Sequence, residues 1–302
     1  MSHAEYRTTA PAARRVGAAA TLAAVLFLAG CNSLALFYNR APTLAYWQLD
    51  SYLDVEKAQK PALQSAIKDW FAWHRAEELP RYVALLSSLR TDVTGPASAA
   101  RICAINDELR AAFRRALAQA LPSLPTLAVT LTGRQRAHLA RRYARANAEL
   151  RETFLDGTPA ERRERTTGRA LDAARDFYGR LDDAQERLIT DGIAASPYDP
   201  SIWIAEREAR QHDTLEILER IAAIRPERRG EVAKKAFAEF AASLATSPRR
   251  PYRDYLARLT GYNCDLIARV HATTTPEQRA HAARELQGWE EDLRAIARRG
   301  DE

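Results

Sequence analysis

The sequence predicts an all-α protein, and two observations carry this prediction. Apolar residues recur at spacings of three and four along most of the chain, as in Ile102, Ile105, Leu109 and Phe113, which is the period of an amphipathic helix. No segment alternates apolar and polar residues over the length of a strand, and the nearest to one, "TLAVTLT" at residues 126–132, has no partner. Because the expected helices have short connections, we predict an antiparallel multi-helix bundle or an irregular stack of helical hairpins.

The first thirty residues have the layout of a secretory signal peptide. A basic segment ends at Arg14 and Arg15, an apolar run follows from Val16 to Ala29, and small residues close it. This run holds 14 residues, whereas a helix that spans a membrane needs about 20. We therefore expect residues 1–30 to be a signal peptide and not part of the fold.

The cysteine after this run indicates the purpose of the signal. "LAGC" at residues 28–31 resembles the lipobox of bacterial lipoproteins, in which a diacylglyceryl group is attached to the cysteine and the signal peptide is cut off before it. The resemblance implies that Cys31 is lipidated and anchors the protein to a membrane. Asn32 stands where an Asp would signal retention in the inner membrane of a Gram-negative cell, which implies the outer membrane and a periplasm-facing protein. The alternative is a chance cysteine in an ordinary signal or anchor.

Residues 31–54 would then form the lipidated N-terminus and a membrane-proximal segment. The stretch "LALFYNRAPTLAYW" from residue 34 concentrates aromatic side chains close to the lipid. Such side chains favour the membrane interface, but a tether, or the packing of a first helix on the core, explains them equally well. Residues 55–302 are expected to form the helical domain.

Four helix starts in that domain are marked by capping boxes. In each, a Thr or Asp stands three residues before a Glu or Gln: at Thr132, Thr158, Asp182 and Thr275. The Thr or Asp side chain then accepts from the third helical N–H, and the Glu or Gln side chain accepts from the backbone N–H of the Thr or Asp. Each cap stabilises its helix by about 1 kcal/mol. We expect helices over residues 42–54, 56–92, 97–121, 133–155, 159–180, 183–195, 200–224, 228–246, 249–273 and 276–298, the second one bent near Pro80.

The composition excludes several classes of protein. No two of the 12 glycines lie within ten positions of each other, which excludes the glycine-rich nucleotide-binding loops and the GxSxG nucleophile elbow. The net charge of +6 falls to +4 when residues 1–31 are removed, because Arg7, Arg14, Arg15 and Glu5 go with them. So small an excess does not indicate nucleic acid as a partner.

Two cysteines remain beyond the signal, Cys103 and Cys264. A disulfide between them suits an oxidising compartment such as the periplasm. Two buried, small apolar side chains are the alternative, because both residues lie in helical patterns. The sequence leaves both possibilities open.

The stretch "WFAWHRAEELPRY" from residue 70 contains the candidate polar site. On a helix His74 shares a face with Glu77 and Glu78, and Arg81 lies one further turn along. A histidine beside a carboxylate could move a proton or hold a metal. Neither HExxH nor the ExxH pair of di-iron bundles occurs in the chain. We therefore expect no metal, no cofactor and no catalytic residue. The alternative for this stretch is a helix with Trp70 and Trp73 inward and its polar residues in surface pairs.

Three arginine-rich runs stand out further along the chain. They are "RRYAR" from residue 141, "ERRER" from residue 161 and "RPERRGEVAKK" from residue 225. On a shared face they could bind lipid A phosphates, acidic headgroups or an acidic partner through bidentate contacts. Each run is also interleaved with Glu or with apolar core positions, which is typical of a solvated helix face.

Several stretches resemble an uncharacterised family of Gram-negative lipoproteins that is known only as a domain of unknown function. They include "FYNRAPTLAYWQLDSYLD" from residue 37, "WFAWHRAEELPRY" from residue 70, "LTGRQRAHLARRYARANAELRETFL" from residue 131 and "TTTPEQRAHAARELQGWEEDLRAIA" near the end. The resemblance covers most of the chain beyond the signal. It implies an all-helical periplasmic lipoprotein and carries no activity with it.

Two hypotheses about function follow. The first is a non-enzymatic interaction or envelope-structural protein, held to the membrane by its lipid and in contact with an envelope protein. The second is an all-α periplasmic enzyme that acts on cell-wall or lipid material, with its site near His74. The sequence leaves the partner, the substrate and the oligomeric state open.

Overall fold

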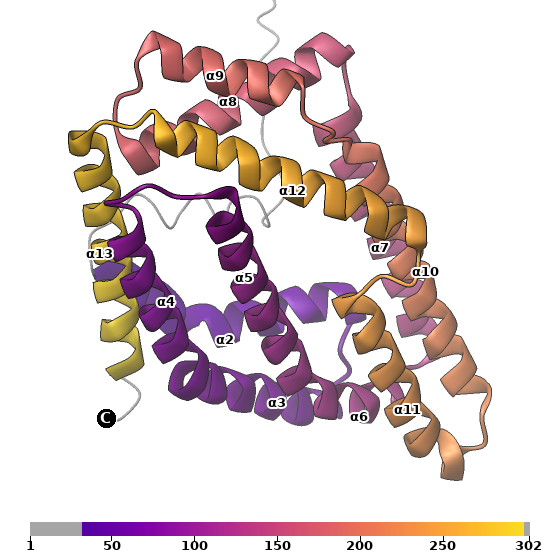
Figure 1. Ribbon diagram of the computed structural model, residues 1–302. Helices are drawn as coiled ribbons and strands as arrows, with labels where there is room; N and C mark the ends of the chain where they lie inside the picture. Colours follow the sequence, from indigo (N-terminus) through magenta and orange to yellow (C-terminus); the bar gives the residue numbers. More distant parts are fainter. Residues whose placement is uncertain (1–31, 299–302) are drawn as a thin grey trace, which may run out of the picture.

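The computed structural model describes residues 32–298, and the all-α prediction is confirmed because this part of the chain contains helices and no strand. Figure 1 shows the helices running in several directions around a central helix, α5. Cys31 and the expected signal peptide lie outside the described residues. The helices are α2 (Asn32–Leu53), α3 (Lys60–Trp73), α4 (Leu79–Asp92), α5 (Ala99–Ala120), α6 (Leu124–Ala128), α7 (Gly133–Leu155), α8 (Pro159–Tyr178), α9 (Asp183–Ala194), α10 (Pro200–Ala223), α11 (Pro226–Ala245), α12 (Arg250–Ala272) and α13 (Pro276–Arg298).

The first helix begins ten residues earlier than residue 42, where we expected it, so that prediction is wrong at its start. Pro42 lies inside α2, although it lacks the N–H that a helix interior uses. The N-terminal part of α2 is held by tertiary packing, since Leu34 and Tyr38 contact the small apolar cluster of Leu79 and Ile296. For these two side chains core packing is therefore the observed role.

The expected helix over residues 56–92 is divided into two. It begins only at Lys60, and a π-helical turn, His74–Glu78, separates α3 from α4. In this wider turn the N–H of Leu79 donates to the carbonyl of His74, five residues back. Pro80 lies directly after the turn and could not continue an α-helix without a clash with the carbonyl four residues before it. The expected helix is thus interrupted near Pro80 by a π turn. Figure 1 shows that α3 and α4 run in different directions.

All four capping boxes form as reciprocal pairs of hydrogen bonds. The side chains of Thr132, Thr158 and Asp182 accept a hydrogen bond from the backbone N–H of the third residue of α7, α8 and α9, respectively. The side chain of that third residue accepts in turn from the backbone N–H of the capping residue. At α13 the N–H of Thr275 donates to Gln278 Oε1 at 2.9 Å, and Gln278 N–H donates to the Thr275 hydroxyl at 3.2 Å.

The glutamines of two boxes also bind each other across the molecule. Gln185 of α9 and Gln278 of α13 exchange two side-chain hydrogen bonds of 2.8 and 2.9 Å. Each Nε2 group makes a second donation, from Gln185 to the Thr273 carbonyl and from Gln278 to the Arg180 carbonyl. Since each Oε1 also accepts from its own box, both amides use all of their donors and both lone pairs.

The same arrangement recurs between α3 and α7. Gln59, directly before α3, and Gln135 of α7 exchange bonds of 3.2 and 2.7 Å. Gln59 donates to the Thr130 carbonyl and Gln135 to the Asp54 carbonyl, again five residues before the partner glutamine. Two pairs of helix starts are therefore joined in the same manner.

Most of the core lies in two apolar clusters. One lies among α6, α7, α10 and α11 and includes Leu139, Ile221 and Phe237. The other lies among α4, α8, α9, α12 and α13 and includes Val270 and Leu286. Helix pairs that are distant in sequence, above all α4 with α13 and α7 with α10, bury these side chains.

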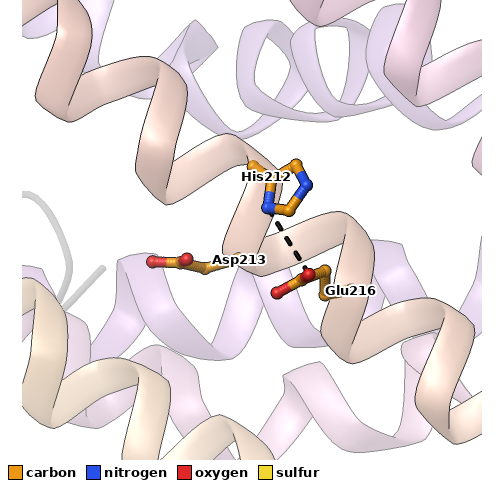
Figure 2. A group of neighbouring side chains, drawn as sticks. All are labelled: His212, Asp213 and Glu216. Atoms are coloured by element: carbon orange, nitrogen blue, oxygen red, sulfur yellow. Dashed lines mark ion pairs between the residues drawn. The ribbon is translucent and has the colours of Figure 1, made fainter.

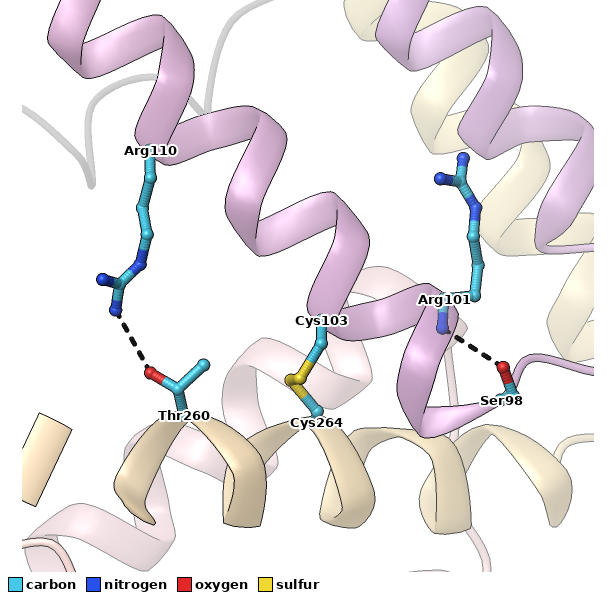
Figure 3. The surroundings of a disulfide bond; sticks show 6 residues. All are labelled: Ser98, Arg101, Cys103, Arg110, Thr260 and Cys264. Carbon is cyan, nitrogen blue, oxygen red and sulfur yellow. Dashed lines mark hydrogen bonds between the residues drawn. A yellow bond between two sulfur atoms is a disulfide. The ribbon is translucent and has the colours of Figure 1, made fainter. Parts of the chain in front are cut away.

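Helix α5 connects the upper and lower parts of the molecule (Figure 1). It packs on α12 near its start and on α3 and α11 further along. The Sγ atoms of Cys103 in α5 and Cys264 in α12 are bonded, with Cα atoms 5.4 Å apart. Figure 3 shows the bridge, together with the hydrogen bond of 3.2 Å from Arg110 to Thr260 one turn along.

Candidate functional site

The π turn places His74 in an aromatic surrounding. Its ring stacks on Trp70, with centroids 4.9 Å apart and an interplanar angle of 18°. Its Nδ1 lies 2.9 Å from the hydroxyl of Tyr38 on α2. Burial lowers the pKa of His74, although the charge of Glu78 acts in the opposite direction, and burial also raises the pKa of Tyr38 to about 12. Burial thus favours the neutral form of both the imidazole and the phenol, which share this hydrogen bond.

Glu78 ends the turn and is fully buried. Its two carboxylate oxygens accept from the fork of Arg115 on α5, at 2.6 and 2.9 Å, and Arg81 lies 3.6 Å away. The hydrogen bonds from Arg115 hold the pKa of Glu78 below its ordinary value despite the opposing effect of burial. Glu78 is thus not the surface residue that the alternative for this stretch assumed.

The three residues expected to form a polar site, His74, Glu78 and Arg81, do lie together, but the structure adds Arg115 as the main partner. No sequence signal pointed to Arg115, which lies 37 residues from Glu78 and follows an ordinary helical pattern. Each oxygen of Glu78 accepts one hydrogen bond from this guanidinium, and the carboxylate is fully buried, so its charge is paired inside the protein. The arrangement is suited to joining α5 to the π turn.

A cavity of about 820 Å³ lies elsewhere, where the end of α7 and the start of α8 meet the segment before α10 and the middle of α12. Its wall contains Arg162, Arg163, Arg165 and Arg169. These residues belong to the run "ERRER" and its continuation along α8. The other two arginine-rich runs contribute nothing to this wall, so the three runs do not converge on it.

A second cavity, of about 450 Å³, has an aromatic wall with a buried carboxylate. Glu206 is 5% exposed, and its Oε1 accepts from Arg210 at 2.6 Å, whereas its Oε2 has no hydrogen-bond partner among the described residues. The sequence did not indicate this place, because its aromatic residues come from α2, α7, α10, α11 and α12: Tyr52, Tyr143, Trp203, Phe240 and Tyr252.

Three potential metal ligands meet on α10, which sequence reasoning missed although their spacing, i, i+1 and i+4, allows it. Ligand atoms of His212, Asp213 and Glu216 lie within 4.8 Å of one another. Figure 2 shows His212 and Glu216 facing each other, 3.7 Å apart, while Asp213 is directed to the side. Asp213 is engaged by Arg249 at 2.6 Å. Because Asp213 already pairs with that guanidinium and His212 and Glu216 are exposed, we assign no metal here.

Taken together, these features define an all-helical protein in which the buried carboxylates of Glu78, Glu206 and Glu290 are paired with arginine side chains and an arginine-rich run lines a cavity. Residues 51–229 match a family of unknown function, DUF6279, and the chain belongs to that family. The match includes the π turn, Arg115 and the arginine run of α8, and it ends before Cys264, α12 and α13. Searches of curated proteins and of solved structures find no match. Among residues 32–298, no helix combines the length and the apolar character needed to cross a membrane.

Proposed function

We propose that this chain is a lipoprotein of the Gram-negative outer membrane, anchored through Cys31 and facing the periplasm, and that it contacts an envelope protein rather than catalysing a reaction. The anchor rests on "LAGC" at residues 28–31 and the signal layout before it. The oxidising periplasm is compatible with the bond between Cys103 and Cys264.

The observation that carries the contact is an exposed apolar pair on α5. Leu109 and Phe113, four residues apart and so on one helix face, are 54% and 57% exposed. The helix that presents them is held by the disulfide at one end and by Arg115 and Glu78 at the other. Aromatic side chains on a rigid support are typical of the centre of protein interfaces.

A photo-crosslinking amino acid at position 113 tests this proposal in cells. We expect a defined adduct with one envelope protein at position 113 and none at Gln119, an exposed polar residue on another face of α5. In a Cys31→Ser chain the adduct should be lost and the protein should leave the outer-membrane fraction. An unchanged fraction and unchanged processing in the presence of globomycin would reject the anchor. Equal labelling from both positions would reject the contact surface.

An enzyme acting on cell-wall or lipid material remains the alternative proposal, because π turns often occur at functional sites. It would use His74 as its base, since Glu78 is occupied by Arg115. Release of products from peptidoglycan or phospholipid by the purified chain, and its loss in His74→Ala, would favour the enzyme over the contact protein.

A further inference from the structure

The arginine-lined cavity has the composition of a ligand site with two chemically different parts. The lining residues from α8 carry the guanidinium groups and the Thr166 hydroxyl. The apolar lining residues include Phe154, Leu155, Ile193 and Leu259, and further polar lining comes from Ser196, Tyr198 and Asn263. A volume of about 820 Å³ is in the range of pockets that hold small organic molecules.

The arginines of this wall differ in how much of their hydrogen-bonding capacity is already used. Arg162 donates to the carbonyls of Leu155 and Gly157, at 2.9 and 2.6 Å, and Arg165 donates to that of Asp156. These two hold the turn between α7 and α8.

The other two arginines retain most of their donors. Arg169 makes one hydrogen bond of 3.3 Å, to the Thr166 hydroxyl, and lies over the ring of Phe154. Arg163 makes no hydrogen bond or ion pair within residues 32–298. Free guanidinium forks bind phosphate groups through paired hydrogen bonds.

Little negative charge opposes these groups. Asp199 is the acidic residue of the wall, and its Oδ1 accepts from the N–H and the hydroxyl of Ser201, at 2.9 and 2.7 Å. The carboxylate of Glu161, next to Arg162 in sequence, is directed to the N–H of Thr158 in the capping box. Four positive charges therefore share the wall with one carboxylate that already caps a helix.

Two helix N-termini add to the positive electrostatic potential of the wall. Pro159 is the first residue of α8 and Pro200 the first of α10, and both lie in the wall. The partial positive charge at the start of a helix favours anions. The helix N-termini and the arginine side chains therefore both favour a bound anion.

We propose that this cavity binds a phosphate ester with an apolar body, its phosphate held by Arg163 and Arg169 and its apolar part against Phe154, Ile193 and Leu259. Both an anionic lipid and a soluble aryl or alkyl phosphate have this chemistry. The site is independent of the proposed anchor and of the contact surface on α5.

Calorimetric titration of the full chain with four probes tests the proposal. The probes are dihexanoyl phosphatidic acid, phenyl phosphate, glycerol 3-phosphate and dihexanoyl phosphatidylcholine. We expect the first two to bind at least tenfold more tightly than glycerol 3-phosphate, and the zwitterionic lipid to bind no better than glycerol 3-phosphate. The tighter of the first two identifies the source as a lipid or a soluble ester.

The double variant R163Q/R169Q should weaken binding of the first two probes at least tenfold. R141Q/R145Q is the matched control: it removes the same charge from exposed residues of α7 outside the cavity, and it should change the affinity less than twofold. Neither pair removes an ion pair within the described residues, so both variants should keep the wild-type thermal unfolding. Equal weakening by both pairs, equal binding of glycerol 3-phosphate, or no binding of any probe would overturn the proposal.

Discussion

Glu78 has the sequence position of a potential site residue, but in the structure its carboxylate is paired with Arg115. From the sequence it stands beside His74 as a potential proton-transfer partner. In the structure its carboxylate is fully buried, and the Arg115 fork takes both oxygens. A buried carboxylate needs such a partner, because an unpaired charge would pay the whole of its lost hydration.

Replacing Glu78 by Gln should lower the free energy of unfolding at neutral pH by roughly 2 kcal/mol, since the charge-assisted bonds to Arg115 are lost. The pKa of Glu78 is lowered in the folded state. Its charge therefore stabilises the fold above the unfolded pKa, near 4.5, and this contribution is lost as the pH falls through the folded pKa. Urea unfolding of both proteins between neutral and acidic pH measures this. A difference that stays constant on acidification would contradict the assignment.

The paired glutamines offer a sharper test, because a nearly isosteric change replaces the donating amide group by an oxygen and adds a negative charge. Gln185→Glu should destabilise the protein by roughly 2–4 kcal/mol, as the carbonyl of Thr273 and the Oε1 of Gln278 each lose a donor. Protonation of the new carboxyl should restore part of the loss at acidic pH. Glu161→Gln, in the exposed box of α8, is the control and should have a much smaller effect in the same urea titration. Equal effects in the two variants would show that the pairing adds nothing to the caps.

At the scale of single elements, α5 is held in position by bonds to α12 and to the π turn. Its N-terminus is capped by Ser98, which accepts from the N–H of Arg101 at 3.1 Å (Figure 3). Along its length it is attached by Cys103 to α12 and by Arg115 to the π turn. A helix of this kind, with Leu109 and Phe113 exposed, gains its stability from attachments more than from burial.

The disulfide should therefore contribute strongly. Cys103 and Cys264 are 161 positions apart in the sequence, and for a loop of that length the chain-entropy model gives about 5 kcal/mol. We expect the double variant C103S/C264S to lose up to that amount of unfolding free energy, measured by urea unfolding. The oxidised wild type should migrate faster than the reduced protein on a denaturing gel. Alkylation of both thiols without reductant would contradict the bond.

At the scale of the whole molecule, the core is divided between two apolar clusters with separate sets of helices. The described part of the chain begins and ends beside the same group, since α2 and α13 both contribute to the cluster around Leu79 and Ile296. The family match covers neither of these ends, because it begins at residue 51, near the end of α2, and stops at residue 229, before α12 and α13.

This division predicts independent contributions from the two clusters. Leu139→Ala and Leu286→Ala should each destabilise the protein by about 2–5 kcal/mol, because both side chains are almost completely buried. Their combination should be additive within about 0.5 kcal/mol. Leu286→Ala and Val270→Ala lie in the same cluster, so the effect of the double variant should differ from the sum of the two single effects. If Leu139→Ala and Leu286→Ala departed from additivity by the same amount, the core would be single and continuous.

The sequence by itself determined the all-α class, the start of most helices and the four capping boxes, because those features depend on residues three or four positions apart. It also placed His74, Glu78 and Arg81 close together along one helix. Only the tertiary structure decided that Arg115 would occupy Glu78, that the capping glutamines would bind each other, and that one arginine run would line a cavity. These contacts join residues dozens of positions apart, and whether two such residues meet depends on how helices pack, which no local pattern records.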